Sequence, residues 1–201
     1  IIGGGATGLG AAVDAATRGY QTLLVEQYDF SKGTSSRSTK LVHGGVRYLE
    51  QGNIKLVKEA LRERAYLLRN APHLTSVQPF IVPVFSWWEK WYYAIGLKMY
   101  DLLSGKLSLG KTQVLSKKQT IAHLPTINTE KLTGGILYFD GQFDDSRLCT
   151  ELAITAAKHG AAIINYCMAV GFSKNKTKIN GVQITDTITG KEYTAHTKAV
   201  I

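Results

Sequence analysis

The sequence predicts an α/β fold in which a three-layer core with parallel strands carries an antiparallel β-meander and is interrupted by an insertion. Three observations indicate this fold. A glycine-rich turn links a first strand to a helix, a second apolar strand ends in a carboxylate, and the tail contains three short strands separated by turns. Between these parts, strands and helices do not alternate regularly, so a simple doubly wound domain is excluded.

The glycine-rich turn follows Ile1-Ile2, which we interpret as the end of a buried strand. The turn satisfies G-x-G-x-x-G, in which the first glycine permits a tight turn and the second lets the backbone approach a pyrophosphate. The third lets the helix predicted for residues 9–19 pack closely on the sheet. We expect a phosphate at the positive helix end, bound by Gly3, Gly5, Ala6, Thr7 and Gly8.

A carboxylate closes the second strand, which is predicted for residues 21–25. Glu26 lies 18 positions after Gly8, where this motif uses an acid to accept hydrogen bonds from ribose hydroxyls. We therefore predict a Rossmann-like, FAD/NAD(P)-binding core, with Glu26 and Gln27 on the adenosine side. The alternative is a glycine-rich turn with a structural role alone.

Periodicity predicts the remaining elements. Residues 53–70 form an amphipathic helix that Pro72 ends, and residues 78–85, with two prolines, form an edge strand. Further helices are expected at residues 87–103, 116–124 and 144–159, the last capped by Asp144 or Asp145. Strands are expected at residues 134–139 and 162–166, the latter buried, and both are assigned to a parallel core formed by residues 1–30 and 134–167. The meander is expected at residues 169–201, with turns near Lys174-Asn175 and Thr189-Gly190.

Composition limits the function classes. The chain has 201 residues and a formal net charge of +9, but its cations are scattered and form no nucleic-acid motif, so we expect no nucleic-acid partner. The charge fits attraction to anionic lipid, or a fragment whose acidic part lies elsewhere. A fragment is also expected because the chain lacks an initial methionine and ends in a strand-like Ala199-Val200-Ile201. Cys149 and Cys167 are expected to be reduced core thiols, and no metal site is expected.

Residues 34–50, TSSRSTKLVHGGVRYLE, concentrate hydroxyls, glycines, a histidine and cations directly after the nucleotide-binding unit. The hydroxyls of Thr34, Ser35, Ser36 and Ser38 can donate hydrogen bonds near the pyrophosphate. Alternatively, some of them cap a helix that begins near Ser36.

This segment, with Ile2-Gly3-Gly4-Gly5-x-x-Gly8-x-Gly10-x-Ala12-x-Asp14 and Arg18-Gly19, resembles the FAD-dependent glycerol-3-phosphate dehydrogenases of the respiratory chain. The resemblance continues at residues 57–61, 71–74, 99–101 and 144–147. Leu9 departs from the family pattern, which usually has a smaller residue there, and the family's second half is absent. The resemblance implies that residues 1–70 and 134–201 form a discontinuous FAD-binding domain and that residues 71–133 belong to an inserted, partial substrate domain.

The resemblance also implies roles for individual residues. The flavin ring is expected beside Lys40, Leu41, His43, Gly44 and Gly45, because glycines let the backbone approach a flat ring, and Ala169 and Val170 contribute to cofactor binding. Arg47 and Tyr48 are expected to bind the substrate phosphate, although Arg47 could instead form a surface ion pair with Glu50. The catalytic base is expected outside the chain.

The implied reaction is oxidation of sn-glycerol 3-phosphate to dihydroxyacetone phosphate, with electrons passing from FAD to a membrane quinone. Two alternatives stay open: an oxidase that uses oxygen, and a fragment that is inactive by itself. Peripheral membrane association is expected, at the inner face of a bacterial cytoplasmic membrane or at the mitochondrial inner membrane, and a homodimer is one expected assembly. The aromatic residues of 87–103, namely Trp87, Trp88, Trp91, Tyr92, Tyr93 and Tyr100, with Lys90 and Lys98, suit a membrane interface, or pack under the substrate domain.

Overall fold

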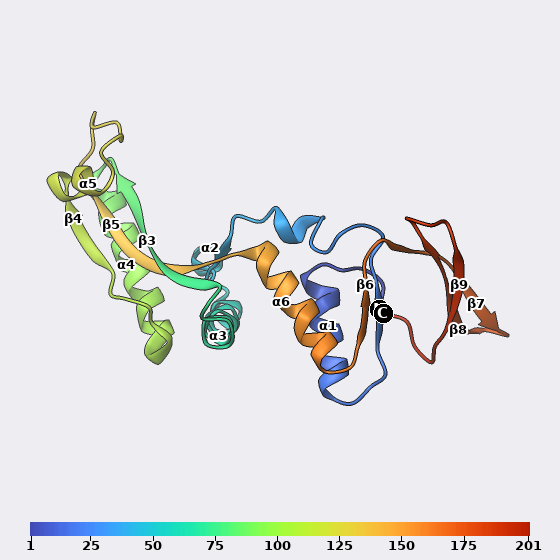
Figure 1. Ribbon diagram of the computed structural model, residues 1–201. Helices are drawn as coiled ribbons and strands as arrows, with labels where there is room; N and C mark the ends of the chain where they lie inside the picture. The colour runs from blue at the N-terminus through green and yellow to red at the C-terminus, as the bar shows by residue number, and fades with distance from the viewer. The chain divides into compact units, whose positions relative to one another are not determined.

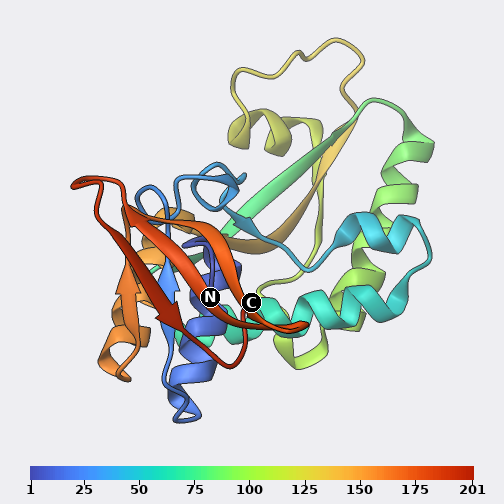
Figure 2. The same ribbon diagram turned by 90° about the vertical axis from the view of Figure 1, so that its right-hand side faces the viewer.

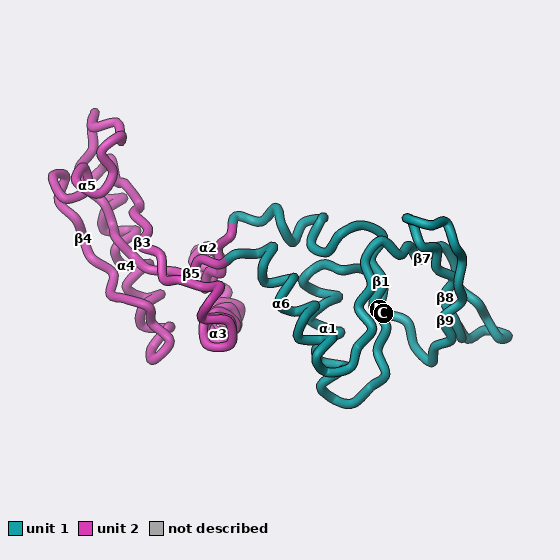
Figure 3. The backbone as a smooth tube through the Cα atoms, in the orientation of Figure 1, with its two compact units in different colours: residues 1–39, 144–201 teal, residues 40–143 magenta. Residues whose placement is uncertain are grey.

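The computed structural model describes residues 1–201 apart from the side chain of Arg47. The chain forms two compact units (Figure 3): unit 1 comprises Ile1–Thr39 and Asp144–Ile201, and unit 2 comprises Lys40–Phe143. The functional division expected at residues 70 and 134 stays a prediction.

Unit 1 has three layers (Figure 1). The middle layer is a parallel pair, β1 (Leu23–Val25) and β6 (Ala162–Ile164), extended by a parallel bridge between Ile2 and Val25. Two helices cover one face, α1 (Ala6–Thr17) and α6 (Asp145–Lys158). The other face is covered by an antiparallel meander, β7 (Cys167–Asn175), β8 (Lys178–Asp186) and β9 (Glu192–His196). The predicted α/β fold with a three-layer core and a meander is confirmed.

The strand period of two explains how β1 serves both faces. Leu24 packs in the cluster formed by the helices, whereas Val25 packs with Cys167, Val182 and Ile184 of the meander. Alanines line the contact between α1 and α6, which allows close packing of the helices: Ala12, Ala16, Ala153 and Ala156. Cys149 and Cys167 are buried free thiols, as predicted.

One expectation for unit 1 is wrong: the strand predicted for residues 162–166 is shorter and is not buried. Ala162 is exposed and Ile164 keeps 42% of its surface accessible. Among the described residues, β6 pairs only with β1, so its other edge and much of its side-chain surface are open.

Unit 2 is built around one long strand, β5 (Gly134–Phe143). On one side, β3 (Thr75–Val84) pairs antiparallel with β5 along its whole length. On the other side, β4 (Gln113–Ser116) pairs with the beginning of β5 and β2 (Leu41–Val42) with its end. The prediction that the proline-containing strand lies at an edge is confirmed, since among the described residues β3 pairs with β5 alone.

The expectation that residues 134–139 belong to the parallel core is wrong. They form the first part of β5, which is antiparallel to all its neighbours in unit 2. Gly134, Gly135, Ile136 and Leu137 are buried in succession, because this strand has partners on both edges and helices against it. A short apolar run is also typical of a parallel strand, and periodicity alone does not separate the two.

Three helices of unit 2 lie where the sequence predicts helices, and each begins at a side-chain cap. They are α3 (Ile54–Asn70) with Asn53 as cap, α4 (Trp87–Ser104) with a capping box of Ser86 and Glu89, and α5 (Lys117–His123) with Ser116 and Gln119. Asp144 caps α6 in unit 1, as one of the two predicted candidates. The short helix α2 (Val46–Glu50) and the 3-10 turns η1 (Thr34–Ser36) and η2 (Gly105–Leu107) were not predicted.

The long helix α4 packs against β3 and β5 through Ala94 and Leu97. Figure 2 shows this helix, in green, beside the two long paired strands. Its opposite face is exposed, with 74% of Trp87 and 61% of Trp91 accessible. Tyr100, expected among the aromatics of a membrane interface, is only 2% exposed. That part of the expectation is wrong, because Tyr100 lies on the packed face of the helix.

Candidate functional site

The predicted phosphate turn of unit 1 requires glycine at two positions, for different reasons. Gly3 has φ of +111°, which favours glycine, and its N–H donates to the carbonyl of Val25 at 2.9 Å. A Cβ on Gly8 would collide with the carbonyl oxygen of Gly3. The third glycine therefore lets α1 begin directly against the turn.

The N-terminus of α1 presents backbone donors. Its cap, Gly5, provides no side-chain hydrogen bond, while the N–H of Ala6 donates to Oγ of Ser35 at 2.9 Å. The N–H groups of Thr7 and Gly8 lie in the first turn, where a helix has no internal acceptor for them. The predicted phosphate-binding residues thus meet at one helix end, and Ser35 joins them from 29 positions away.

Glu26 lies at the end of β1, as predicted, and is half-buried. Its Oε2 accepts from the N–H of Gly4 at 2.7 Å and its Oε1 accepts from the N–H of Tyr28 at 2.9 Å. A carboxylate has about four lone-pair positions, so both oxygens retain capacity for ribose hydroxyls. Gly4 has a role that the motif did not reveal: a Cβ there would lie 2.8 Å from Cβ of Glu26.

Ser31 is a polar residue of this region that sequence reasoning missed. Its backbone is left-handed, with φ of 66°, and its N–H donates to the carbonyl of Gly4 at 2.9 Å. The side chain is buried, and its Oγ has no partner among the described residues. Strained backbone and an unsatisfied buried hydroxyl are both characteristic of binding sites. Only the neighbouring glycine-rich turn could have drawn attention to it.

The hydroxyl segment adopts a 3-10 turn at Thr34–Ser36, so the expected helix beginning near Ser36 is wrong. Oγ of Ser36 lies 3.4 Å from the carbonyl of Gly33. Ser38 binds the start of α6 instead, because its Oγ donates to Oδ2 of Asp145 at 2.7 Å. Thr34 is exposed. Of these hydroxyls, Ser35 is the one that the structure brings to the phosphate turn.

Three predicted cofactor residues of unit 1 lie at strand ends or irregularities. Gln27 is exposed directly after Glu26. Ala169 and Val170 lie in β7, where the pairing with β8 shifts between Ala169 and Gly171. Such bulges commonly redirect the backbone near binding sites, and Val170 is 50% exposed there.

In unit 2, the predicted flavin-facing segment begins with Lys40, which has φ of 59°. Its carbonyl accepts from the N–H of Phe143 at 2.9 Å, and Leu41 follows in β2, opposite Gln142. The end of β5 therefore holds the start of this segment.

The loop His43-Gly44-Gly45 exposes one side chain above a buried backbone. His43 is exposed, while both glycines are buried. Nδ1 of His43 accepts from the N–H of Gly45 at 3.1 Å, and Gly45 has φ of +78°. A Cβ on Gly44 would collide with the hydroxyl of Tyr100. Glycine is thus required at both positions for different reasons: close packing at Gly44 and backbone conformation at Gly45.

The predicted substrate pair lies on α2. The side chain of Arg47 lies outside the described residues, so its expected role stays a prediction. The ring of Tyr48 is partly buried against the cluster of Val57, Leu61 and Tyr100. This packing gives Tyr48 a structural role whether or not its hydroxyl also contacts substrate.

A buried charge network that the sequence did not reveal lies behind the loop. Arg64 and Asp140 form an ion pair at 2.9 Å, with their side chains 1% and 3% exposed. Asp140 also accepts from the hydroxyl of Tyr100 at 3.1 Å and from the N–H of Gly44 at 3.2 Å. Arg64 donates to the carbonyl of Leu107 at 2.8 Å. Burial, together with the charge of Asp140, raises the pKa of Tyr100, so its phenol stays a neutral donor.

Unit 1 fits a dinucleotide by its own groups. The first-turn donors of α1, the space left by Gly8, the carboxylate of Glu26 and the unsatisfied hydroxyl of Ser31 lie along one turn. These groups can bind phosphate, ribose hydroxyls and a further polar atom of such a cofactor.

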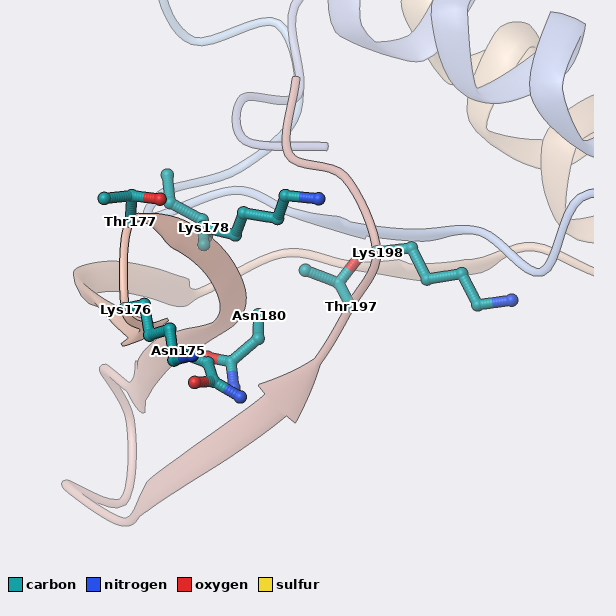
Figure 4. Close-up of a pocket in the computed structure, with 8 residues that line it drawn as sticks. Asn175, Lys176, Thr177, Lys178, Asn180, Thr197 and Lys198 are labelled. Atoms are coloured by element: carbon teal, nitrogen blue, oxygen red, sulfur yellow. The ribbon is translucent and has the colours of Figure 1, made fainter.

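A second hollow of the surface is separate from the predicted site residues. A surface pocket of about 560 Å³ lies at the turn between β7 and β8 and is lined by Lys176, Lys178, Lys198 and neighbouring polar residues. Figure 4 shows that the ammonium groups of Lys178 and Lys198 lie apart, and none of the predicted site residues lines this pocket. Within the described part of the chain, no group of three or more His, Cys, Asp or Glu side chains could hold a metal.

Comparisons with known proteins agree with this geometry. A family model described as FAD dependent oxidoreductase matches residues 1–201. The chain is 48% identical over 214 aligned positions to "Glycerol-3-phosphate dehydrogenase, mitochondrial" of Homo sapiens, covering all of this chain and 29% of that protein. The resemblance predicted from the motifs is confirmed by this similarity, although the chain spans less than a third of the relative's length.

Solved structures extend the comparison. The glycerol-3-phosphate dehydrogenase of Bacillus halodurans, solved with FAD, matches with a TM-score of 0.74 and 36% identity over 98% of this chain and 32% of that chain. An L-α-glycerophosphate oxidase of Mycoplasma pneumoniae, also with FAD bound, matches 91% of this chain and 47% of that chain, with a TM-score of 0.66 and 17% identity. The second match shows the shared fold alone. From the family match over its whole length, the chain belongs to the FAD-dependent oxidoreductase family.

Proposed function

We propose that the protein containing this chain oxidises sn-glycerol 3-phosphate to dihydroxyacetone phosphate. The observation that carries the proposal is the 48% identity to a mitochondrial glycerol-3-phosphate dehydrogenase over the entire chain. FAD, when bound, supplies the hydride acceptor for carbon 2 of the substrate. The residues of this chain bind FAD and orient the substrate.

Each unit contributes a different part of this task. The turn of Gly3, Gly5 and Gly8 binds the pyrophosphate, with Ala6, Thr7 and Ser35, and Glu26 binds the adenosine ribose. The loop His43-Gly44-Gly45 contacts the flavin ring with exposed imidazole and bare backbone. Arg47 holds the substrate phosphate, which is the task that a bidentate guanidinium performs best. The catalytic base lies outside this chain.

Steady-state kinetics of the full-length protein test the reaction. We expect glycerol 3-phosphate to reduce the bound flavin and a quinone analogue to reoxidise it faster than oxygen does. Faster reoxidation by oxygen would instead assign an oxidase, and absence of flavin reduction would contradict both. Isolated residues 1–201 are expected to show no turnover, because the rest of the substrate pocket lies elsewhere.

Arg47→Ala in the full-length protein tests the phosphate site. A charge-assisted hydrogen bond contributes about 1.5–3 kcal/mol, so KM for glycerol 3-phosphate should rise roughly tenfold to a hundredfold. Flavin absorbance per protein should not change. Unchanged kinetics would remove Arg47 from the substrate site.

We also propose that the full-length protein binds a membrane peripherally through the exposed face of α4. Trp87, Trp88, Trp91 and Tyr92 are each more than half exposed, and the helix carries Lys90 and Lys98. Aromatic and cationic residues on one helix suit the interface of an anionic membrane. No helix of the described residues combines the length and hydropathy needed to span a bilayer. A membrane quinone is the proposed acceptor, and the mitochondrial inner membrane the proposed location by analogy with the relatives.

Liposome co-sedimentation tests this surface. Trp88→Ser with Trp91→Ser should release the full-length protein from anionic vesicles, whereas Ile188→Ser, at an exposed position of unit 1, should not. Equal binding of both variants would contradict the proposed membrane surface. It would favour packing of the exposed face of α4 under another part of the protein.

A further inference from the structure

Asp140 accepts hydrogen bonds from four donors, one on its own strand and three on other segments of unit 2. Its carboxylate accepts from Nη1 of Arg64 on α3 at 2.9 Å and from the hydroxyl of Tyr100 on α4 at 3.1 Å. It accepts from the N–H of Gly141, its neighbour on β5, at 3.0 Å. The N–H of Gly44 completes the set and lies 3.2 and 3.3 Å from the two oxygens. Three of these donors lie on helices or on the sheet, and the fourth belongs to the loop His43-Gly44-Gly45, in which only His43 is exposed.

The ion pair alone does not require a bond to the loop. Arg64 on α3 already balances the charge of Asp140, and Tyr100 on α4 provides a second side-chain donor. Gly44 nevertheless packs so tightly against Tyr100 and Leu61 that a Cβ would collide with both. The backbone of Gly44 is therefore held by contact and by hydrogen bonding in the same place.

A second hydrogen bond within the loop fixes the imidazole of His43. Gly45, whose backbone is left-handed, donates its N–H to Nδ1 of His43. In a neutral imidazole one nitrogen accepts and the other carries the proton. With Nδ1 accepting, the proton lies on Nε2, so the loop selects one tautomer and one ring orientation.

We infer that Asp140 is a positioning residue, which fixes the backbone of Gly44 and thereby holds the exposed His43 with Nε2 as the donor. The inference rests on the proposed function, since His43 serves a ligand only if the loop faces the flavin or the substrate. Its recipient would be an oxygen or nitrogen acceptor on one of these two groups. Asp140 touches neither of them and acts through the loop.

Asp140→Asn in the full-length flavoprotein tests the inference. The amide keeps the shape of the carboxylate but places a donor at one of the two oxygen positions near the N–H of Gly44, so this N–H keeps one neutral acceptor in place of a shared carboxylate. We expect hydrogen exchange in a peptide covering residues 41–48 to accelerate roughly tenfold or more. Flavin reduction at saturating substrate should slow by roughly tenfold, with KM within about threefold of the unaltered protein. Flavin content should hold, because the phosphate turn lies in unit 1.

Thr120→Val is the matched control for simple loss of stability. Thr120 is fully buried in unit 2, and its hydroxyl donates to the carbonyl of Ser116 at 2.9 Å. It should lower the melting temperature while exchange at residues 41–48 and flavin reduction per bound flavin stay unchanged. If Asp140→Asn behaves like this control, Asp140 is structural and the inference is overturned.

Tyr100→Phe provides a second test should Asp140→Asn not fold. It removes one donor to Asp140 and the hydroxyl that packs on Gly44, so exchange at residues 41–48 should rise by a few-fold. Unchanged exchange in this variant would overturn the inference. If glycerol 3-phosphate fails to reduce the flavin of the unaltered protein, the proposed function fails, and the exchange measurement still decides whether Asp140 holds the loop.

Discussion

The phosphate turn of unit 1 and the loop of unit 2 both depend on glycines, but they are held in different ways. In the turn, the backbone itself provides the constraint: Gly8 fits only because it lacks a Cβ against the carbonyl of Gly3. In the loop, a buried carboxylate provides it, because Asp140 binds the N–H of Gly44 from 96 positions away. The turn is held by contacts within a short segment, whereas the loop is assembled by residues distant in sequence.

The difference shows where each site is vulnerable. A local backbone turn fails when a side chain is added within it. An assembled loop fails when a distant charge loses its partner. Substitutions in the two regions should therefore differ in size, in distance from the site and in their response to pH.

The largest effect on flavin binding is expected for Gly8→Ala, because the added methyl meets the backbone carbonyl of Gly3. We expect about 3 kcal/mol of destabilisation and a flavin affinity lower by roughly a hundredfold, measured by flavin absorbance of the full-length protein during dialysis. Gly10→Ala in the same helix is the control, since no atom lies within 4 Å of its Cβ position. Equal flavin retention by both variants would show that the turn tolerates side chains.

A smaller effect on flavin binding, from a position outside the turn, is expected for Arg64→Met. It leaves Asp140 buried without a counter-charge, which typically costs about 3–5 kcal/mol of unfolding free energy, measured by urea denaturation. Flavin affinity should fall less than in Gly8→Ala. Arg62→Met, at an exposed position of the same helix, should change stability by less than about 0.5 kcal/mol.

The double variant Arg64→Met with Asp140→Asn sharpens this test. It removes both charges, so we expect it to recover more than half of the lost stability. No recovery would mean that the packing of the Arg64 side chain, rather than its charge, provides the lost stability.

The smallest effect concerns alkaline pH. Burial, with the charge of Asp140, raises the pKa of Tyr100, whereas the unfolded phenol titrates near pH 10. The unfolded state therefore loses this proton first, and stability is fully present below about pH 10 and falls as pH rises above it. Each pH unit above about 10 should remove about 1.4 kcal/mol of unfolding free energy.

Tyr100→Phe lacks this proton, so its stability should fall less steeply between about pH 10 and 12. Tyr20→Phe, at a position that is 69% exposed, should leave the slope unchanged. Identical slopes for Tyr100→Phe and the unaltered protein would show that the hydroxyl is not buried beside Asp140.

The same contrast explains what the sequence could predict. The turn, Glu26 and the cap of α6 follow from residues close together along the chain, so spacing and cap chemistry identified them. Residues 134–139 were assigned to the wrong sheet because a short buried run has no period that separates parallel from antiparallel pairing. Arg64 looked like one more charge on an amphipathic helix, and only the fold shows that its side chain is buried.

Other features needed three dimensions for a different reason. Ser31 and Gly4 are ordinary residues until the turn brings them together, and the hydroxyls of residues 34–38 offered several equal candidates. The structure selects Ser35 for the phosphate turn and gives Ser38 to Asp145. Hydroxyls bond over short distances, so their partners are set by packing and not by composition.

The pairing of β2 with the end of β5 has one further consequence. Leu41 lies opposite Gln142, and Lys40 is bonded to Phe143, so the chain enters and leaves unit 2 through neighbouring strand positions. An inserted segment whose ends are already adjacent adds almost no loop-closure entropy to the chain that hosts it, however long the insertion is. Evolution could therefore enlarge, shorten or exchange unit 2 while the host fold stays closed, which is one way for a single nucleotide-binding scaffold to acquire many substrates.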